Sequence, residues 1–449
     1  MIKIETNINK NKRWEKSKID FSQNNNKKNN NIDSKAKSKS NNENSKIVTI
    51  EVFPNKEKQT WIGMGGAITE ASSYNMDKLE KDEKEAFINA YYSKEGLNYN
   101  LGRVSIASND FCLKKYQLTK KKDLRDFSID HDRQSIIPNI KEIQKKKILE
   151  FVASPWSPPR FMKTTRLLIF GGHLRKKYYD LYSEYLTRFI REYAEEGINI
   201  KYLTIQNEPE ARQIWESCVF SLEQQKDLIY NYMIPKMKKY KLDTKLLVWD
   251  HNKERLSEVA NFLIQKNPYI AGIGYHYYTG PHPEQVKKTR EDFKDIMMIH
   301  TEGCCGFSPY NENKWINDAE IYLDDIVKDI NNGGNGYIDW NIFLDYKGGP
   351  TDKRNFCKSP IILDEDNHFK LTPIYYYLGH ISKYFEPGSI IIKNDSKDNN
   401  LLVATCKNKN KTITTICNNT NEDCEINLKL EEKKIDDTIK SHSIITYII

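Results

Sequence analysis

The sequence predicts an α/β protein: a (β/α)8 TIM barrel with an accessory antiparallel β-sandwich. Two observations support this fold class. Between residues 62 and 342, eight short apolar or β-branched runs alternate with amphipathic stretches, as in a parallel barrel. After about residue 385, short alternating runs are separated by Asn, Asp and Lys clusters, which is typical of an antiparallel sandwich. An open doubly wound sheet is the alternative, but no Gly-x-Gly-x-x-Gly motif follows the first run.

The eight expected barrel strands are apolar runs of five to eight residues, and amphipathic stretches lie between most of them. The strands are expected at 62–69, 101–107, 148–155, 201–206, 245–249, 272–277, 296–301 and 336–342. The helices are expected at 76–93, 133–146, 177–196, 221–239, 253–266 and 314–331. The stretch at 221–239 opens with Ser-Leu-Glu-Gln, the spacing of a helix capping box.

Four segments of different composition give the expected domain organisation. Residues 1–45 are predicted to be a largely disordered tail, because their Asn, Lys and Ser residues bury too little apolar surface. Within the tail, only WEKSKIDF (14–21) could supply a further strand. Residues 46–60 begin with the strand-like KIVTIEVF and are expected to join the sandwich. The barrel is expected over 61–384 and the sandwich over 385–449.

The charge distribution argues against nucleic acid as a partner. The net charge is +8, but residues 1–50 hold 12 Lys and Arg against 5 Asp and Glu, which leaves the rest of the chain nearly neutral. No apolar run approaches the 18 residues of a membrane span, and no signal peptide follows the first Met. We therefore expect a cytoplasmic protein without a membrane span. The sequence does not indicate its oligomeric state.

The eight cysteines lack the spacing of a metal site. None forms a Cys-x-x-Cys pair, and no histidine spacing completes a zinc pattern. Free buried thiols are expected, and no structural metal.

Polar and aromatic residues gather where the expected strands end, which is where barrel enzymes build their active sites. Glu208 ends the fourth strand and Glu302 the seventh, so both carboxylates can face one cavity. Cleavage of a glycoside requires one carboxylic acid for the leaving oxygen and one carboxylate at the sugar carbon. Asn207 precedes Glu208 and could bond a sugar 2-hydroxyl, and Pro209 prevents the strand from continuing.

Five motifs, in this order along the chain, resemble glycoside hydrolase family 30. They are WIGMGGAITEAS (61–72), ASPWSPPRFMKT (153–164), LTIQNEPEARQIWESC (203–218), HTEGCCG (300–306) and GYIDWNIFLDYKGGP (336–350). The family includes glucosylceramidases, β-glucosidases and endo-β-1,6-glucanases.

The resemblance implies retaining hydrolysis of a β-linked glycoside through a covalent glycosyl-enzyme, with Glu208 as acid/base, Glu302 as nucleophile and no cofactor. The positions that resemble sugar-binding residues of the family are Arg103, Asp110, Trp156, Asn207, His276, Tyr278 and Trp340. As the acid, Glu208 is expected to have a raised pKa, because Glu302 and the aromatic walls disfavour its charged form.

Three features depart from the family pattern. Thr351 stands where Asn commonly follows Gly-Gly-Pro, and TTRLLIFGGHL (164–174) is apolar where the family is polar. Asn109 and Cys112 flank Asp110 in place of Cys and Ser. Three alternatives stay open: a carbohydrate-binding protein without turnover, a β-xylosidase or β-fucosidase of the same fold, and an inverting or transglycosylating barrel.

Overall fold

The computed structural model describes residues 1–21, 47–306, 310–353, 355–398 and 400–449. The chain forms two compact units. One is Gln59–Gly388, and the other combines Met1–Lys58 with Ser389–Ile449.

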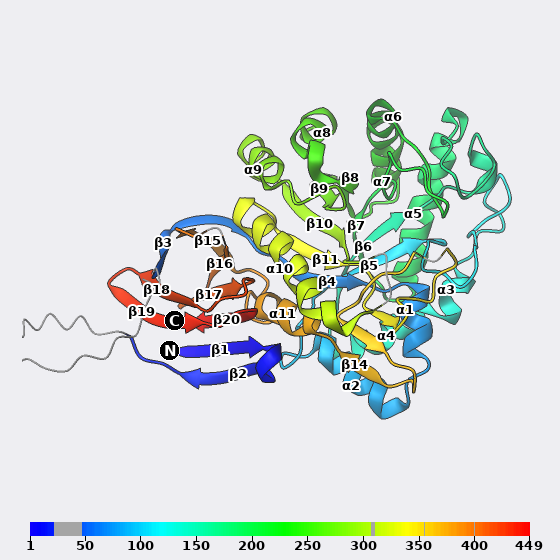
Figure 1. Ribbon diagram of the computed structural model, residues 1–449. Coiled ribbons are helices and arrows are strands. Elements are labelled where there is room, and N and C mark those ends of the chain that lie inside the picture. The colour runs from blue at the N-terminus through cyan, green and yellow to red at the C-terminus, as the bar shows by residue number, and fades with distance from the viewer. Residues whose placement is uncertain (22–46, 307–309, 354, 399) are drawn as a thin grey trace, which may run out of the picture. The chain divides into compact units, whose positions relative to one another are not determined.

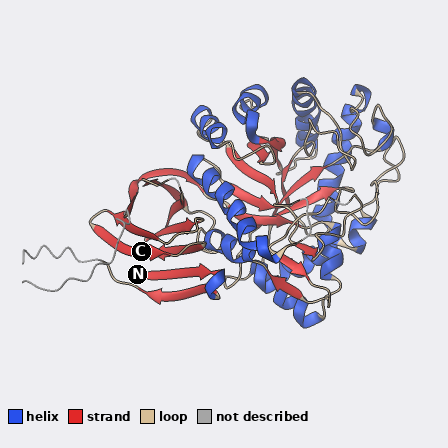
Figure 2. Cartoon of the chain, viewed as in Figure 1, coloured by secondary structure: helices blue, strands red, loops and turns tan. Residues whose placement is uncertain are grey.

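The larger unit contains a closed barrel of eight parallel strands, confirming the predicted fold class (Figure 1). The strands are β4 (Gly63–Ala67), β5 (Leu101–Ile106), β6 (Glu150–Pro155), β7 (Ile200–Leu203), β8 (Lys245–Asn252), β9 (Ile270–His276), β10 (Met297–Gly303) and β11 (Gly336–Asp339). Each overlaps one of the expected apolar runs. Figure 2 shows these strands in red with helices in blue around them.

An apolar layer fills part of the barrel interior. It is built from residues on six of the eight strands: Leu101, Val152, Tyr202, Leu247, Ile299 and Ile338. Each lies before the carboxyl end of its strand. The side chains that follow toward the carboxyl ends are therefore free to be polar, and this end holds the site.

Helices connect the strands largely where the amphipathic pattern places them. They are α1 (Glu70–Met76), α2 (Lys81–Tyr92), α3 (Asp130–Gln134), α4 (Ile136–Lys146), α5 (Tyr179–Glu195), α6 (Leu222–Asp227), α7 (Ile234–Lys239), α8 (Leu256–Leu263) and α10 (Trp315–Asn332). A π-helical turn joins α6 to α7. The capping box forms: Gln224 N donates to Ser221 Oγ at 3.2 Å, and Ser221 N donates to Gln224 Oε1 at 3.0 Å.

Among the described residues, five α-helices and strands of this unit have no counterpart in the expected pattern. They are α9 (Pro283–Asp292), α11 (Pro373–Ser382) and a three-stranded sheet of β12 (Phe343–Asp345), β13 (Ile361–Leu363) and β14 (Phe369–Leu371). In α9 only Val286 and Thr289 are buried, so its sequence carries almost no apolar periodicity.

The second unit is a nine-stranded sheet in the order β19-β18-β3-β15-β16-β17-β20-β1-β2. Seven of these strands are β3 (Val48–Thr60), β15 (Ile390–Ser396), β16 (Leu401–Asn408), β17 (Lys411–Asn418), β18 (Cys424–Leu430), β19 (Lys433–Ile439) and β20 (Ser443–Ile448). The strand expected at 46–60 therefore joins the C-terminal sheet, as predicted, although β3 runs parallel to β18. Buried residues of β3, β15–β20 form one core, with β19 also contacting β20, so the sheet folds over its own apolar face.

The expectation of a largely disordered N-terminal tail is wrong for residues 2–18. These form β1 (Ile2–Asn7) and β2 (Lys12–Lys18), and β1 pairs with β20 from Ile2–Ile448 to Thr6–Ile444. Ile4 and Thr6 are fully buried, so two alternate side chains suffice to attach this short strand. The rest of the expected tail, 22–46, lies outside the described residues.

Among the described residues, no helix combines the length and the apolar character needed to cross a bilayer.

Candidate active site

A cavity of about 150 Å³ lies at the carboxyl ends of the barrel strands. Its lining includes seven of the nine predicted site residues: Asp110, Trp156, Asn207, Glu208, Tyr278, Glu302 and Trp340. The two others, Arg103 and His276, are fully buried and contact the glutamates instead of lining the cavity. The structure thus brings all nine together.

Glu302 lies at the end of β10, where the strand register shifts after His300. Two donors hold its carboxylate: Arg103 Nη1 at 2.5 Å from Oε2, and the Tyr278 hydroxyl at 2.9 Å from Oε1. These contacts fix both oxygens while leaving the side chain at the cavity wall. Such a carboxylate is oriented for attack on a bound carbon.

Glu208 follows β7 in a left-handed backbone conformation, with φ of 46°. Its N–H donates to the Asp250 carbonyl at 2.9 Å, which fixes this turn. His276 Nδ1 lies 3.3 Å from Glu208 Oε1. One carboxylate oxygen of Glu208 lies within 4.8 Å of one of Glu302. This spacing fits the retaining geometry, in which the carboxyl groups are about 5–5.5 Å apart.

Asp250 contacts both Arg103, which holds Glu302, and His276, which contacts Glu208. Its Oδ2 accepts from Arg103 Nη2 at 3.0 Å, and its Oδ1 lies 3.1 Å from His276 Nε2. Hydroxyls of Ser154, Thr204 and Thr301 add further bonds at 2.9, 2.6 and 2.6 Å. A bulge in β8 produces this position, because Trp249 and Asp250 both have positive φ and the register to β9 shifts there.

The charges of this network set the protonation of the glutamates. Although burial favours the neutral form, Glu302 and Asp250 raise the pKa of His276 to about 9. Burial also opposes ionisation of Glu208, but the hydrogen bond with His276 and the charges of His251 and His276 lower its pKa overall. The expectation of a raised pKa for Glu208 is therefore wrong in this arrangement, because it omitted His276. For Glu302, burial outweighs His276 and Arg103 and raises the pKa.

Two stacked tryptophans form an aromatic wall. The rings of Trp156 and Trp340 lie 5.1 Å apart at an interplanar angle of 18°, and Phe111 meets Trp340 edge-on. The Arg103 guanidinium lies 4.9 Å from the Trp156 ring, a cation–π contact that helps to keep Arg103 in place.

Asp110 occupies another side of the cavity, and the unusual Thr351 supports it. The Thr351 hydroxyl donates to the Asp110 carbonyl at 2.9 Å, and Asn355 Nδ2 donates to Asp110 Oδ2 at 2.6 Å. Burial and the charge of Glu302 raise the pKa of Asp110 well above its usual range. Thr351 therefore acts on Asp110 through the backbone.

Several lining residues were not predicted from the sequence. His251 and Asn252 directly follow the expected fifth strand, as does Asp250 beneath them, so the strand-end rule could have found all three. Gln213 and Trp215 lie in the long loop after Glu208. Asn355 and Cys357 lie beyond β12, and no sequence signal marked that segment.

Within the described part of the chain, two groups of histidine and acidic side chains have ligand atoms close enough for a metal ion. One is Glu208, His276 and Glu302, where Arg103 already supplies a positive charge 2.5 Å from Glu302. The other is His300, Asp325 and Asp329. There the Lys253 ammonium lies 2.7 and 2.6 Å from the two aspartates, so both groups are internally charge-balanced.

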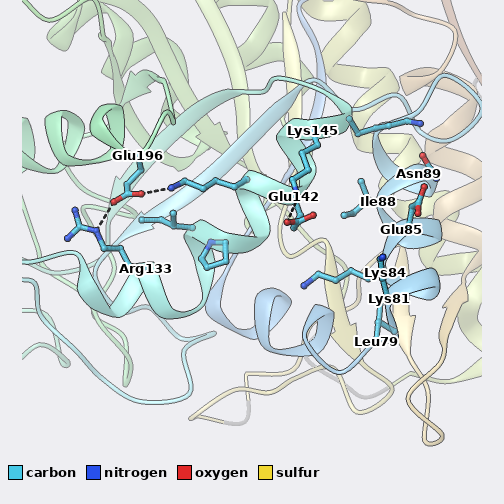
Figure 3. A pocket seen from close by; sticks show the side chains of 14 residues that line it. Leu79, Lys81, Lys84, Glu85, Ile88, Asn89, Arg133, Glu142, Lys145 and Glu196 are labelled. Carbon is cyan, nitrogen blue, oxygen red and sulfur yellow. Dashed lines mark hydrogen bonds and ion pairs between the residues drawn. The ribbon is translucent and has the colours of Figure 1, made fainter.

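A larger hollow of about 1070 Å³ lies between α2 and α4, on the outside of the barrel (Figure 3). Two of its acidic side chains are engaged in surface ion pairs, as Figure 3 shows for Glu196 with Arg133 and for Glu142 with Lys145. The hollow contains none of the predicted site residues, and it lacks the opposed carboxylates of a hydrolase. Size alone therefore does not identify the active site.

Residues 62–385, well over half of the chain, match the Glycosyl hydrolase family 30 TIM-barrel domain. The chain belongs to glycoside hydrolase family 30. This family 30 hydrolase is 28% identical to the lysosomal acid glucosylceramidase of Mus musculus over 425 residues, or 88% of this chain and 82% of the relative. It is 24% identical to an endo-1,6-β-D-glucanase of Neurospora crassa over 364 residues, or 77% and 74% of the two chains.

Among solved structures, SrfJ from Salmonella typhimurium superimposes with a TM-score of 0.89 at 26% identity, covering 100% of this chain and 99% of SrfJ. The family match, with the glucosylceramidase and glucanase relatives, identifies the chain as a retaining β-glycosidase. The alternatives, a carbohydrate-binding protein without turnover and a β-xylosidase or β-fucosidase of the same fold, are not favoured.

Proposed function

We propose that this hydrolase is an exo-acting β-glucosidase in which Glu302 is the nucleophile and Glu208 the acid/base. The observation that carries the proposal is the pair of carboxylates within 4.8 Å of one another at the wall of a cavity of about 150 Å³. A cavity of this size accommodates one sugar ring rather than an extended chain. Glucose is the proposed sugar because the named relatives are a glucosylceramidase and a glucanase.

In the first step, a Glu302 oxygen attacks the anomeric carbon while the leaving oxygen takes a proton from Glu208. Arg103 and Tyr278 hold Glu302 so that one oxygen faces the carbon. Asn207 accepts from Arg103 Nη2 at 2.9 Å through its side-chain oxygen, which leaves its amide N–H groups to bond the sugar. The product is a covalent glycosyl-enzyme with inverted configuration.

In the second step, Glu208 accepts a proton from water, which attacks the same carbon and releases Glu302. Glu302 carries no charge while it is esterified. Glu208 can then remain ionised beside His276, as a general base requires. Two inversions give net retention.

The catalytic proton belongs to the Glu208–His276 pair. The pKa of Glu208 is lowered while that of His276 is raised to about 9, so the pair keeps one proton at neutral pH. As the leaving oxygen departs, this single proton passes from His276 Nδ1 to Glu208 across the 3.3 Å contact and from Glu208 to the leaving oxygen, which leaves His276 neutral and Glu208 ionised. His276 is thus proposed as a positioning residue and proton reserve.

The acceptor side of the cavity favours an apolar aglycone. Leu167, Phe170 and Ile214 are 45%, 53% and 51% exposed, and we call them the apolar rim. Phe170 N donates to the Gln213 carbonyl at 2.8 Å, which joins the segment 164–174 to the loop that lines the cavity. A lipid-like aglycone such as that of a glucosylceramide would cover these side chains.

Trapping and a substrate series test the proposal. A 2-deoxy-2-fluoro-β-glucoside should label Glu302, identified by peptide mass. Among aryl glycosides, the glucoside should exceed the xyloside and fucoside in kcat/KM. Labelling of another carboxylate would refute the assignment of Glu302, and a preferred xyloside would refute the proposed sugar.

The aglycone needs its own test. The ratio of kcat/KM for octyl over methyl β-glucoside should fall in a Phe170→Ser, Ile214→Ser variant. The control is Ile148→Ser, since Ile148 is 71% exposed but precedes β6 at the amino ends of the barrel strands, whereas the cavity lies at their carboxyl ends. An unchanged ratio in the double variant would contradict the apolar aglycone without affecting the catalytic roles.

A further inference from the structure

Two cysteines face each other in the wall of the active-site cavity. Cys304 follows Glu302 by two residues and Cys357 lies 53 positions further on, and both line the cavity. Their sulfur atoms are 3.0 Å apart, and the side chains are 3% and 1% exposed. The glycosidase mechanism uses neither thiol.

The backbone already holds the two segments side by side. Gly306 and Cys357 form an antiparallel bridge, and Lys358 N donates to the Cys305 carbonyl at 3.1 Å. A disulfide has its sulfurs about 2.05 Å apart. The two sulfurs therefore need to approach by only about 1 Å, which small side-chain and loop movements can supply.

The same segments hold residues that act on the sugar. The Tyr278 hydroxyl lies 3.7 Å from Cys304 Sγ and 2.9 Å from Glu302 Oε1. Asn355, two residues before Cys357, donates to Asp110. Pulling Cys304 and Cys357 together would therefore disturb Glu302 on one side of the cavity and Asp110 on the other.

We propose that Cys304 and Cys357 are a reversible oxidation site, whose disulfide lowers the glycosidase activity. The oxidant is a small two-electron acceptor, such as a peroxide. One thiolate attacks the O–O bond, forming a sulfenic acid and releasing the other oxygen as water. The second thiolate then attacks that sulfur, the S–O bond breaks, and a second water leaves as the S–S bond forms. Two thiols and one hydrogen peroxide thus give one disulfide and two waters.

The reduced pair is stable at neutral pH. Burial, the adjacent Cys304 and the carboxyls of Asp110 and Glu302 raise the pKa of Cys357 well above its usual value. Because thiolates are the reactive species, oxidation of this pair should be slow at neutral pH and faster as the pH rises.

Diamide provides a direct test on the full-length protein, since it takes two electrons and two protons from a thiol pair. The reduced enzyme should lose about 10- to 100-fold in kcat/KM, the range expected for a displacement near 1 Å. Intact mass should fall by about 2 Da, the loss of two hydrogens in forming one disulfide. Non-reducing peptide mapping should identify a Cys304–Cys357 link, and dithiothreitol should restore activity.

Two variants separate this pair from the other thiols. In Cys357→Val, diamide should not change the activity that the variant has before treatment. Cys424→Ser should respond like the wild type, because Cys424 lies on β18 in the other unit. If Cys357→Val fails to fold, the wild-type time courses of disulfide formation and inactivation must coincide.

Three outcomes would overturn the proposal. They are a mapped Cys304–Cys357 link with full activity, a link between other cysteines, and inactivation that persists in Cys357→Val. Intact mass and peptide mapping do not depend on the sugar, so they test the disulfide even if the proposed substrate is wrong.

Discussion

Arg103 and His276 act on opposite glutamates from beneath the cavity, and Asp250 contacts both of them. Arg103 and Asp250 are fully buried and 3.0 Å apart, so each charge is compensated by the other. Removing one partner would leave an uncompensated buried charge. Arg103 and Asp250 are consequently unsuitable for tests that must separate catalysis from folding.

Changing the nucleophile should abolish turnover. Glu302→Gln keeps the size and a hydrogen-bond acceptor but cannot form the glycosyl ester, so kcat should fall on the order of 10⁴-fold or more. Azide should give at most an α-glycosyl azide, the inverted product. A Glu302→Gln protein with ordinary turnover and a retained product would contradict the assignment.

Replacing the acid should make the rate depend on the leaving group. In Glu208→Ala, a dinitrophenyl glucoside should still glycosylate the enzyme, because its leaving group needs no proton. Alkyl glucosides should lose about 10²–10⁴-fold, the usual contribution of general acid catalysis. The basic limb of the kcat/KM profile should also disappear. An unchanged basic limb would mean that another group supplies the proton.

His276→Gln should raise the pKa of Glu208. In the wild type, the hydrogen bond and positive charge of His276 lower that pKa against the effect of burial. Glutamine keeps a donor but removes the charge. Difference infrared titration of the Glu208 carboxyl, identified by its loss in Glu208→Gln, measures the shift. If the pKa of Glu208 is unchanged or lower in His276→Gln, then His276 is not the group that lowers it in the wild type.

For the individual site residues, the sequence predicted which side chains lie together but not how they interact. All nine predicted residues lie at the site because strand ends in a barrel converge whatever the loops do. Two things could not be predicted. The bulge that places Asp250 requires knowledge of the register, and the position of His276 against Glu208 reverses an expected pKa shift.

Among the elements, β1 has a larger role than its composition suggests. It pairs with β20 on one side and with β2 on the other. Without it, β20 would present an unpaired edge. The barrel strands were predictable because eight short apolar runs alternate with amphipathic stretches, whereas β1 is a single run of six residues next to an Asn/Lys-rich stretch.

Deleting residues 1–21 should destabilise the sheet unit but spare the catalytic chemistry. Loss of β1 and β2 removes the pairing of β20 and the burial of Ile4, which should lower the first thermal transition by more than about 5 °C. Protein that remains folded should keep its kcat on an aryl glucoside, because the cavity is built from Gln59–Gly388. Scanning calorimetry with an activity assay checks both. An unchanged transition would mean that β1 contributes little to stability.

For the whole molecule, buried histidines predict loss of stability at alkaline pH. The pKa of His276 is raised from 6.5 to about 9. Burial lowers the pKa of His300, but Asp325 and Asp329 outweigh burial and raise it overall. A group with a raised folded-state pKa stabilises fully below its unfolded pKa, and this contribution is lost as the pH rises through the folded value. Tm should therefore decline between about pH 6.5 and 9, and less steeply in His276→Gln. Parallel Tm curves would contradict this linkage.

The order of the strands along the chain constrains how the protein can be made. β1, β2 and β3 leave the ribosome before the barrel, yet β1 pairs with β20 and β3 lies between β15 and β18. During translation the complete barrel sequence is synthesised before any of these partners exists. A premature stop codon between residues 389 and 442 would therefore release a chain with an entire barrel but with β1 lacking its partner β20. Such a product would be prone to edge-to-edge association rather than merely shortened.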